Sequence, residues 1–223
     1  MEVPYQALSF DAAGTLFELA EPVGHTYARL ALASGVDLPQ AALQQGFRNA
    51  WKKYSDVLKV GIGDDRAFWR RLVGETFASA SAAQSTFPVE ISDHLFDTIF
   101  DYYANGSAWR LYPETDAVLR RFSDKLPMVV ISNFDRRLRR VLDELGIIEY
   151  FDAVIISDEH GFRKPHRELF SVALNILQLS PAHLLHVGDD PRCDWQGAET
   201  AGCQAFRLDR PGASLIDLPV PQK

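Results

Sequence analysis

The sequence has few cysteines, no long apolar run and no excess of positive charge. Its two cysteines, Cys193 and Cys203, could form one disulfide bond at most, which excludes a disulfide-rich secreted domain. No apolar run approaches the roughly 20 residues that a membrane-spanning helix needs, and no basic segment followed by an apolar stretch resembles a signal peptide. The formal net charge of -7 argues against binding to a phosphate backbone. We therefore expect a soluble cytoplasmic protein that binds neither nucleic acid nor a membrane.

Repeats and low-complexity tracts are also missing. Hydrophobic residues make up 47% and charged residues 24% of the 223 residues, which is ordinary for a globular protein. This length allows one large domain or one domain with an inserted module. The oligomeric state is left open by the sequence.

Short apolar runs, each followed by polar residues, indicate buried β-strands. Between them, apolar stripes at helical spacing indicate amphipathic helices, with Gly146 placed as a helix C-cap. This alternation predicts an α/β core with a Rossmann-like parallel sheet, both faces of which are covered by helices. The predicted strands are residues 5–10, 127–132, 152–157, 183–188 and 204–208, and the stripes are Val118, Leu119 and Phe122; Leu138, Val141, Leu142 and Leu145; and Leu169, Phe170, Ala173, Ile176 and Leu177.

The segment 19–108 has helical periodicity and little strand character. We interpret it as an inserted helical cap domain of about four helices, separated near residues 36–39, 61–65 and 78–88, whereas residues 1–18 and 109–223 form the core domain. Ligands of open α/β sheets bind outside the carboxyl ends of the strands, so we expect the cap to cover that edge. The aromatic residues Trp51, Trp69, Phe96 and Phe100 are expected in the cap core, and Gly61-Ile62-Gly63 is expected to be a hinge or turn.

Polar side chains follow four of the predicted strands. Because the carboxyl ends of parallel strands share one edge, Asp11, Ser132, Lys164, Asp189 and Asp194 are expected to lie together. Carboxylates gathered in one place repel one another unless a cation lies among them, and an all-oxygen set suits magnesium better than zinc. A lysine and a hydroxyl beside them suit an anionic phosphoryl group. Each residue taken alone has a simpler interpretation as a turn aspartate, helix cap or solvated lysine.

Four motifs in order, Asp11-x-x-Gly14-Thr15-Leu16, Ile131-Ser132-Asn133, Lys164-Pro165 and Gly188-Asp189-x4-Asp194, resemble those of the haloacid dehalogenase-like hydrolases. The resemblance covers nearly the whole chain, and the insertion corresponds to the helical cap of that family. The stretch 132–138 is most similar to the branch called haloacid dehalogenase-like hydrolase domain-containing protein 3.

The resemblance implies a magnesium-dependent hydrolase, a phosphatase that acts on a small phosphorylated metabolite through an aspartyl-phosphate. It implies that Asp11 is the nucleophile and that Ser132 and Lys164 are the other catalytic residues. Asp190 either assists these residues or points elsewhere. The implied substrate-binding residues are Gly14, Thr15, Ser132, Asn133 and Lys164, and the implied Mg²⁺ ligands are Asp11, the backbone carbonyl of Ala13, Asp189 and Asp194.

The sequence departs from the family pattern at Ala13. Family phosphatases usually carry an aspartate there, which protonates the leaving alcohol and later activates water, and losing such help typically costs ~10²–10⁴ in rate. Three alternatives therefore stay open: a phosphate-binding or protein-interacting pseudoenzyme, a dehalogenase that attacks carbon without a metal, and a phosphonatase that forms a Schiff base with a cap lysine. The candidate lysines are Lys52, Lys53 and Lys59, and the acidic pair Asp189 and Asp194 disfavours the dehalogenase.

Two further groups of residues have ordinary structural interpretations. The run Arg136, Arg137, Arg139 and Arg140 is expected to form a solvated helix face. The histidines show no metal-ligand spacing, and His183 and His186 are expected to pack or to form hydrogen bonds.

Overall fold

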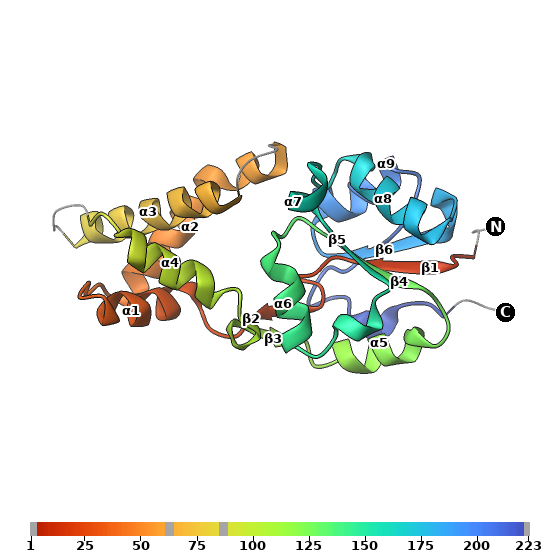
Figure 1. Ribbon diagram of the computed structural model, residues 1–223, viewed down its shortest axis with the longest axis horizontal. Helices are drawn as coiled ribbons and strands as arrows, with labels where there is room; N and C mark the ends of the chain where they lie inside the picture. The colour runs from red at the N-terminus through yellow and green to blue at the C-terminus, as the bar shows by residue number, and fades with distance from the viewer. Residues whose placement is uncertain (1–3, 61–64, 85–88, 221–223) are drawn as a thin grey trace. The chain divides into compact units, whose positions relative to one another are not determined.

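The computed structural model describes residues 4–60, 65–84 and 89–220, without the side chains of residues 55–60. The chain forms two compact units (Figure 1). The first, called the core unit here, comprises Met1–Glu18 and Arg110–Lys223, and the second, the cap unit, comprises Leu19–Trp109. Within the described part of the chain, no helix combines the length and the apolar character needed to cross a membrane.

The core unit contains a five-stranded parallel sheet with the strand order β5-β4-β1-β6-β7. Every residue of β1, β4 and β6 is buried, as expected for central strands that are covered on both faces. The predicted α/β class with a Rossmann-like parallel sheet is confirmed. Each strand begins and ends within two residues of the limits predicted from its apolar run. The strands are β1 (Ala7–Phe10), β4 (Met128–Ser132), β5 (Ala153–Ile156), β6 (Leu184–Gly188) and β7 (Gln204–Arg207).

Helices lie on both sides of this sheet, with α8 and α9 on one side and α5 on the other (Figure 1). Most residues of the predicted apolar stripes are buried, but Leu145 and Leu177 are only partly buried and Ile176 is 51% exposed. Gly146 follows α6 with a φ of +70°, which fits its predicted capping position. The helices are α5 (Thr115–Ser123), α6 (Arg137–Glu144), α7 (Ser157–His160), α8 (Arg167–Leu177) and α9 (Gly197–Thr200), with a π-helical turn at Pro191–Gln196 and 3₁₀ turns at Ile148–Tyr150, Pro181–His183 and Leu215–Asp217.

A small sheet of two strands forms where the chain leaves and re-enters the core unit. It consists of β2 (Phe17–Leu19) and β3 (Trp109–Leu111), and Arg110 pairs with Glu18 across it at 2.6 Å. The sequence did not predict these strands, because three residues are too few for a period of two to be recognised.

The described residues of the cap unit form four helices, α1 (Val23–Ala33), α2 (Gln40–Val60), α3 (Asp65–Ala83) and α4 (Asp93–Tyr102), followed by a 3₁₀ turn at Gly106–Ala108. Helix α3 continues past residue 78, where the sequence predicted a break, since its last turn is rich in alanine and lacks glycine and proline. The helices enclose their own apolar core. That core includes Tyr27, Leu43, Val73, Phe77, Leu95, Phe96 and Ile99.

The predicted cap aromatics lie in different environments. Phe96 is buried, and Trp69 and Phe100 pack against the same cluster. Trp51 is 40% exposed and stacks on Phe47 and Trp69, so its prediction as a core residue is wrong. The glycines of Gly61-Ile62-Gly63 lie outside the described residues. The expectation that the cap covers the strand ends stays a prediction.

Candidate active site

The loop after β1 places Asp11 at the carboxyl edge of the sheet. The backbone N–H of Asp11 donates to the carbonyl of Val187 at 2.9 Å, which anchors the loop to β6. Gly14 has a φ of +95°, and a Cβ atom built on it would lie 2.5 Å from Oδ2 of Asp189. Glycine is therefore required at position 14 for its backbone conformation and for the close approach of Asp189.

Lys164 joins two of the predicted carboxylates. Its Nζ atom lies 2.7 Å from Oδ1 of Asp11 and 2.6 Å from Oδ1 of Asp194, and the lysine is 1% exposed. Burial alone would lower the pKa of Lys164, but the charges of Asp11 and Asp194 raise it above its ordinary value. The lysine therefore remains a cation and neutralises part of the negative charge of the carboxylates. From the sequence, a metal ion was expected to neutralise this charge.

Residues at the end of β4 hold this lysine in place. The side-chain amide of Asn133 donates to the Lys164 carbonyl and accepts from its N–H, so its side chain positions the lysine loop. Its predicted contact with substrate stays a prediction. The Ser132 hydroxyl donates to Oδ1 of Asp11 at 3.4 Å and accepts from the Phe134 N–H at 3.3 Å. The structure thus brings the predicted serine and the predicted nucleophile into contact.

Asp194 is fully engaged by donors of the protein. Its Oδ1 receives Lys164 and lies 3.2 Å from Nε2 of His186, and its Oδ2 accepts from the Asp190 N–H at 2.9 Å. A Cβ atom on Gly188 would collide with this carboxylate, so a glycine is needed there too. Burial would raise the pKa of Asp194, but Lys164 and His186 together lower it below its ordinary range. These contacts give Asp194 a role in orienting its neighbours.

Asp11 and Asp189 retain oxygens that could hold a metal ion. Burial, opposed by Lys164 and reinforced by the charges of Asp194 and Asp189, raises the pKa of Asp11 to about 7. Burial and the charge of Asp194 also raise the pKa of Asp189, whose Oδ1 accepts from Thr15 at 3.3 Å. Burial is the largest cause of both pKa shifts, and the charges of neighbouring carboxylates add to them.

The donor set fits a hard divalent cation. Carboxylate oxygens of Asp11, Asp189 and Asp194 lie within 4.8 Å of one another. Ala13 lies two residues after Asp11 in the same loop, and its carbonyl stays a predicted ligand of the same cation. Magnesium prefers oxygen ligands of this kind. The geometry thus groups three of the predicted metal ligands, Asp11, Asp189 and Asp194.

Comparisons with known proteins identify the family. Residues 5–202 match the sequence model of the haloacid dehalogenase-like hydrolases. The haloacid dehalogenase-like hydrolase domain-containing protein 3 of Bos taurus is 33% identical over 209 residues, and that of Homo sapiens is 33% identical over 211 residues; each match covers 92% of this chain and 82% of the relative. The chain belongs to the haloacid dehalogenase-like hydrolase family. The resemblance found in the sequence is confirmed.

Solved structures of the haloacid dehalogenase-like family share the fold. YfnB of Bacillus subtilis, solved bound to magnesium, superposes with a TM-score of 0.76 at 16% identity, over 99% of this chain and 93% of its own. L-2-haloacid dehalogenase from Xanthobacter autotrophicus superposes with a TM-score of 0.68 at 23% identity, over 92% of this chain and 78% of its own. At these identities the likeness establishes the fold alone.

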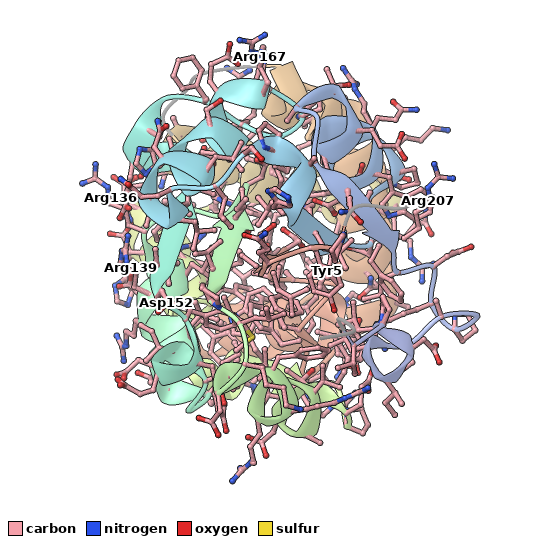
Figure 2. All side chains as sticks on the ribbon, turned by 90° about the vertical axis from the view of Figure 1, so that its right-hand side faces the viewer. Tyr5, Arg136, Arg139, Asp152, Arg167 and Arg207 are labelled. Carbon is pink, nitrogen blue, oxygen red and sulfur yellow. The ribbon has the colours of Figure 1, made fainter. Side chains whose placement is uncertain are left out.

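Asp190 and the arginine run near the family motifs have structural roles. Asp190 caps the π-helical turn, since its Oδ1 accepts from the N–H groups of Arg192 and Cys193. The arginine run lies on and beside α6, and Figure 2 shows Arg136 and Arg139 on the same side of the core unit. Arg136, Arg139 and Arg140 are solvated as predicted, whereas the side chain of Arg137 is only 12% exposed, because it pairs with the buried Asp135. The other three pair with Asp158, Glu159 and Glu144.

Sequence reasoning did not assign Ser9 or His186 to the family site. His186 was expected to pack or to form hydrogen bonds, and it does both, at 1% exposure. Burial lowers the pKa of His186, although the hydrogen bond to Asp194 opposes that shift, so the ring is neutral near pH 7. The sequence feature that could have indicated this pair is a single polar residue, Ser9 or His186, in each of two otherwise apolar strands.

Proposed function

We propose that the protein is a cytoplasmic, magnesium-dependent phosphatase that hydrolyses a small phosphorylated metabolite through an aspartyl-phosphate on Asp11. The observation that carries the proposal is the position of Lys164, which bridges Asp11 and Asp194 while Asp189 lies beside them. A buried cation next to a carboxylate nucleophile and a divalent-cation site is suited to an anionic phosphoryl group.

The reaction has two displacements at phosphorus. In the first, a carboxylate oxygen of Asp11 bonds to phosphorus while the bond to the leaving oxygen breaks. In the second, water attacks phosphorus, the bond to Asp11 breaks, and inorganic phosphate leaves with the carboxylate regenerated. Ser132 and Lys164 stabilise the phosphoryl oxygens by hydrogen bonding and charge, and Gly14, Thr15 and Asn133 shape the phosphoryl site.

Magnesium, held by Asp11, Asp189 and the Ala13 carbonyl, would supply charge neutralisation and a fixed template. Asp194 keeps Lys164 in place behind these ligands. Because the carboxylates around Asp11 would otherwise repel a phosphate ester, we expect hydrolysis to require the ion.

The methyl side chain of Ala13 restricts the substrates. It can neither protonate a leaving alkoxide nor remove a proton from water, so alkyl phosphates should react slowly. Acyl and aryl phosphates leave as stable anions and need little protonation. We therefore place the substrate among phosphorylated metabolites with a good leaving group.

Ala13 also favours a second candidate function, a pseudoenzyme that binds phosphate and magnesium without turnover. The phosphonatase alternative has less support. Nζ of Lys53 donates a hydrogen bond to Glu75 at 2.9 Å, and this bond raises the pKa of the lysine. A Schiff base, in contrast, forms from a neutral amine. Lys52 is exposed, and the side chain of Lys59 lies outside the described residues. A metal-free dehalogenase has no use for Asp189 beside the nucleophile.

One panel of assays separates these functions. Release of phosphate from p-nitrophenyl phosphate is measured with magnesium and with a chelator, and release of halide from 2-chloropropionate is measured in parallel. We expect magnesium-dependent phosphate release and no halide, and we expect Asp11→Asn to abolish the former. Magnesium binding without phosphate release would favour the pseudoenzyme. Halide release that is unaffected by the chelator would favour the dehalogenase.

A further inference from the structure

A buried pair of polar side chains lies beneath the site. Ser9 of β1 and His186 of β6 are opposite each other in the parallel register, and their exposures are 0% and 1%. The Ser9 hydroxyl lies 2.9 Å from Nδ1 of His186, and Nε2 of the same ring lies 3.2 Å from Oδ1 of Asp194. Polar groups are buried in a sheet core only when their hydrogen bonds are made, and both ring nitrogens have partners here.

The partners fix which nitrogen carries the proton. Asp194 is ionised and can only accept, so Nε2 of His186 must donate to it. The neutral ring then has no proton on Nδ1, which accepts from the Ser9 hydroxyl. The ring of Phe170 packs at right angles to the imidazole, with the centroids 5.1 Å apart, and limits its rotation.

His186 supplies one of three donors that hold the Asp194 carboxylate. The other two are Lys164 and the backbone N–H of Asp190, and the three come from different segments of the chain. Without the imidazole donor, the carboxylate could turn about its terminal torsion, for which the barrier is low. Lys164 would then lose its fixed partner and move toward Asp11.

We propose that His186, oriented by Ser9, is a positioning residue that fixes the Asp194 carboxylate and thereby holds Lys164 between Asp194 and the nucleophile Asp11. The consequence for turnover rests on the proposed function. The hydrogen-bonded chain itself does not, and each can be tested separately.

Two substitutions separate the donor from the shape of the ring. His186→Gln keeps an N–H group near the position of Nε2, whereas His186→Phe fills the space without a donor. Replacing a residue that orients a ligating or catalytic side chain from behind typically lowers activity ~10–100-fold. We expect His186→Phe to lower kcat for an aryl phosphate at least about tenfold while KM and the half-saturating magnesium concentration change less than twofold, and His186→Gln to recover most of kcat.

Matched controls exclude a general loss of structure. His183 also has a serine partner, with its Nδ1 2.9 Å from Oγ of Ser180, but this pair is exposed, so His183→Gln should leave kcat unchanged. Ser9→Ala removes only the orienting hydroxyl and should lower kcat less than His186→Phe does. A folded His186→Phe protein with normal kcat, or a His186→Gln protein as impaired as His186→Phe, would overturn the proposal.

A spectroscopic arm needs no turnover. In ¹⁵N-labelled protein, His186 should carry its proton on Nε2, and the Lys164 ammonium should give a slowly exchanging signal that persists in His186→Gln and is lost in His186→Phe. A proton on Nδ1, or a Lys164 signal that is unchanged in His186→Phe, would contradict the inference. If the wild-type protein hydrolyses no phosphate ester, the proposed function fails, and these spectra still decide the role of His186.

Discussion

The side-chain amide of Asn133 makes two hydrogen bonds with the backbone of Lys164, donating to its carbonyl at 2.9 Å and accepting from its N–H at 2.7 Å. This pair ties the loop that carries the lysine to the end of β4, where Ser132 contacts Asp11. The groups proposed to bind the phosphoryl group are therefore held by side chain–backbone contacts between segments that are distant in the sequence.

Replacing Asn133 by alanine should destabilise the protein and lower the rate of phosphate-ester hydrolysis. The buried partners on Lys164 would lose both hydrogen bonds, which typically costs about 1–3 kcal/mol of the free energy of unfolding. We expect kcat to fall more than KM rises, because Lys164 becomes less well placed. Chemical denaturation and steady-state kinetics measure both effects. Asn49→Ala is the control, since the Asn49 side chain accepts from Gln45 in an exposed contact, and equal stability of the two variants would count against this account.

Gly14→Ala should remove the magnesium response. The added Cβ would lie 2.5 Å from Oδ2 of Asp189 and would push that carboxylate away from Asp11. The control is Gly146→Ala, which has a φ of +70° but nothing within 4 Å of the new Cβ, so it carries the backbone strain without the collision. Thermal unfolding with and without millimolar magnesium should show a shift in the control and none in Gly14→Ala. A full shift in Gly14→Ala would mean that the ion binds elsewhere.

The pKa of Asp11 predicts a linkage between protons and magnesium. The pKa is about 7 in the metal-free folded protein and 3.8 as the ordinary value, so between these pH values the folded state binds more protons than the unfolded state. The contribution of Asp11 to stability is therefore present at low pH and lost as the pH rises through about 7.

Magnesium competes with that proton, so its apparent affinity should rise with pH and level off above about pH 7. Magnesium titrations of the wild type and of Asp11→Asn between pH 5 and 8 measure this. In Asp11→Asn the same pH dependence should be reduced. An affinity independent of pH in the wild type would show that Asp11 does not titrate in this range.

Much of the core could be predicted from the sequence, because buried strands are apolar runs and parallel strands end at one edge. That reasoning brought Asp11, Lys164 and Asp194 together correctly. It did not predict that Lys164 lies between the two carboxylates, since such contacts depend on side-chain rotamers. Strands β2 and β3 were too short to recognise, and the pairing of Ser9 with His186 follows from the strand register, which is a tertiary property.

Restoring a carboxylate at position 13 should help poor leaving groups most. Ala13→Asp is expected to raise kcat/KM for an alkyl phosphate by at least about tenfold, and to raise it less for an aryl phosphate, because an alkoxide gains most from a proton donor. The ratio of kcat/KM for the two esters in both proteins is the measurement, with the first turnover followed separately. An unchanged ratio in a folded variant that binds magnesium would mean that Ala13 does not limit the reaction.

The central claim is that Asp11 itself becomes phosphorylated. Because Ala13 offers no base to activate water, the aspartyl-phosphate should persist long enough to be trapped. Borohydride reduces an acyl phosphate to the alcohol, so peptide mass spectrometry after incubation with an aryl phosphate, magnesium and borohydride should find homoserine at position 11. The Asp11→Asn protein and a sample with chelator should show none. Phosphate release by the wild type with an unmodified Asp11 would contradict the account.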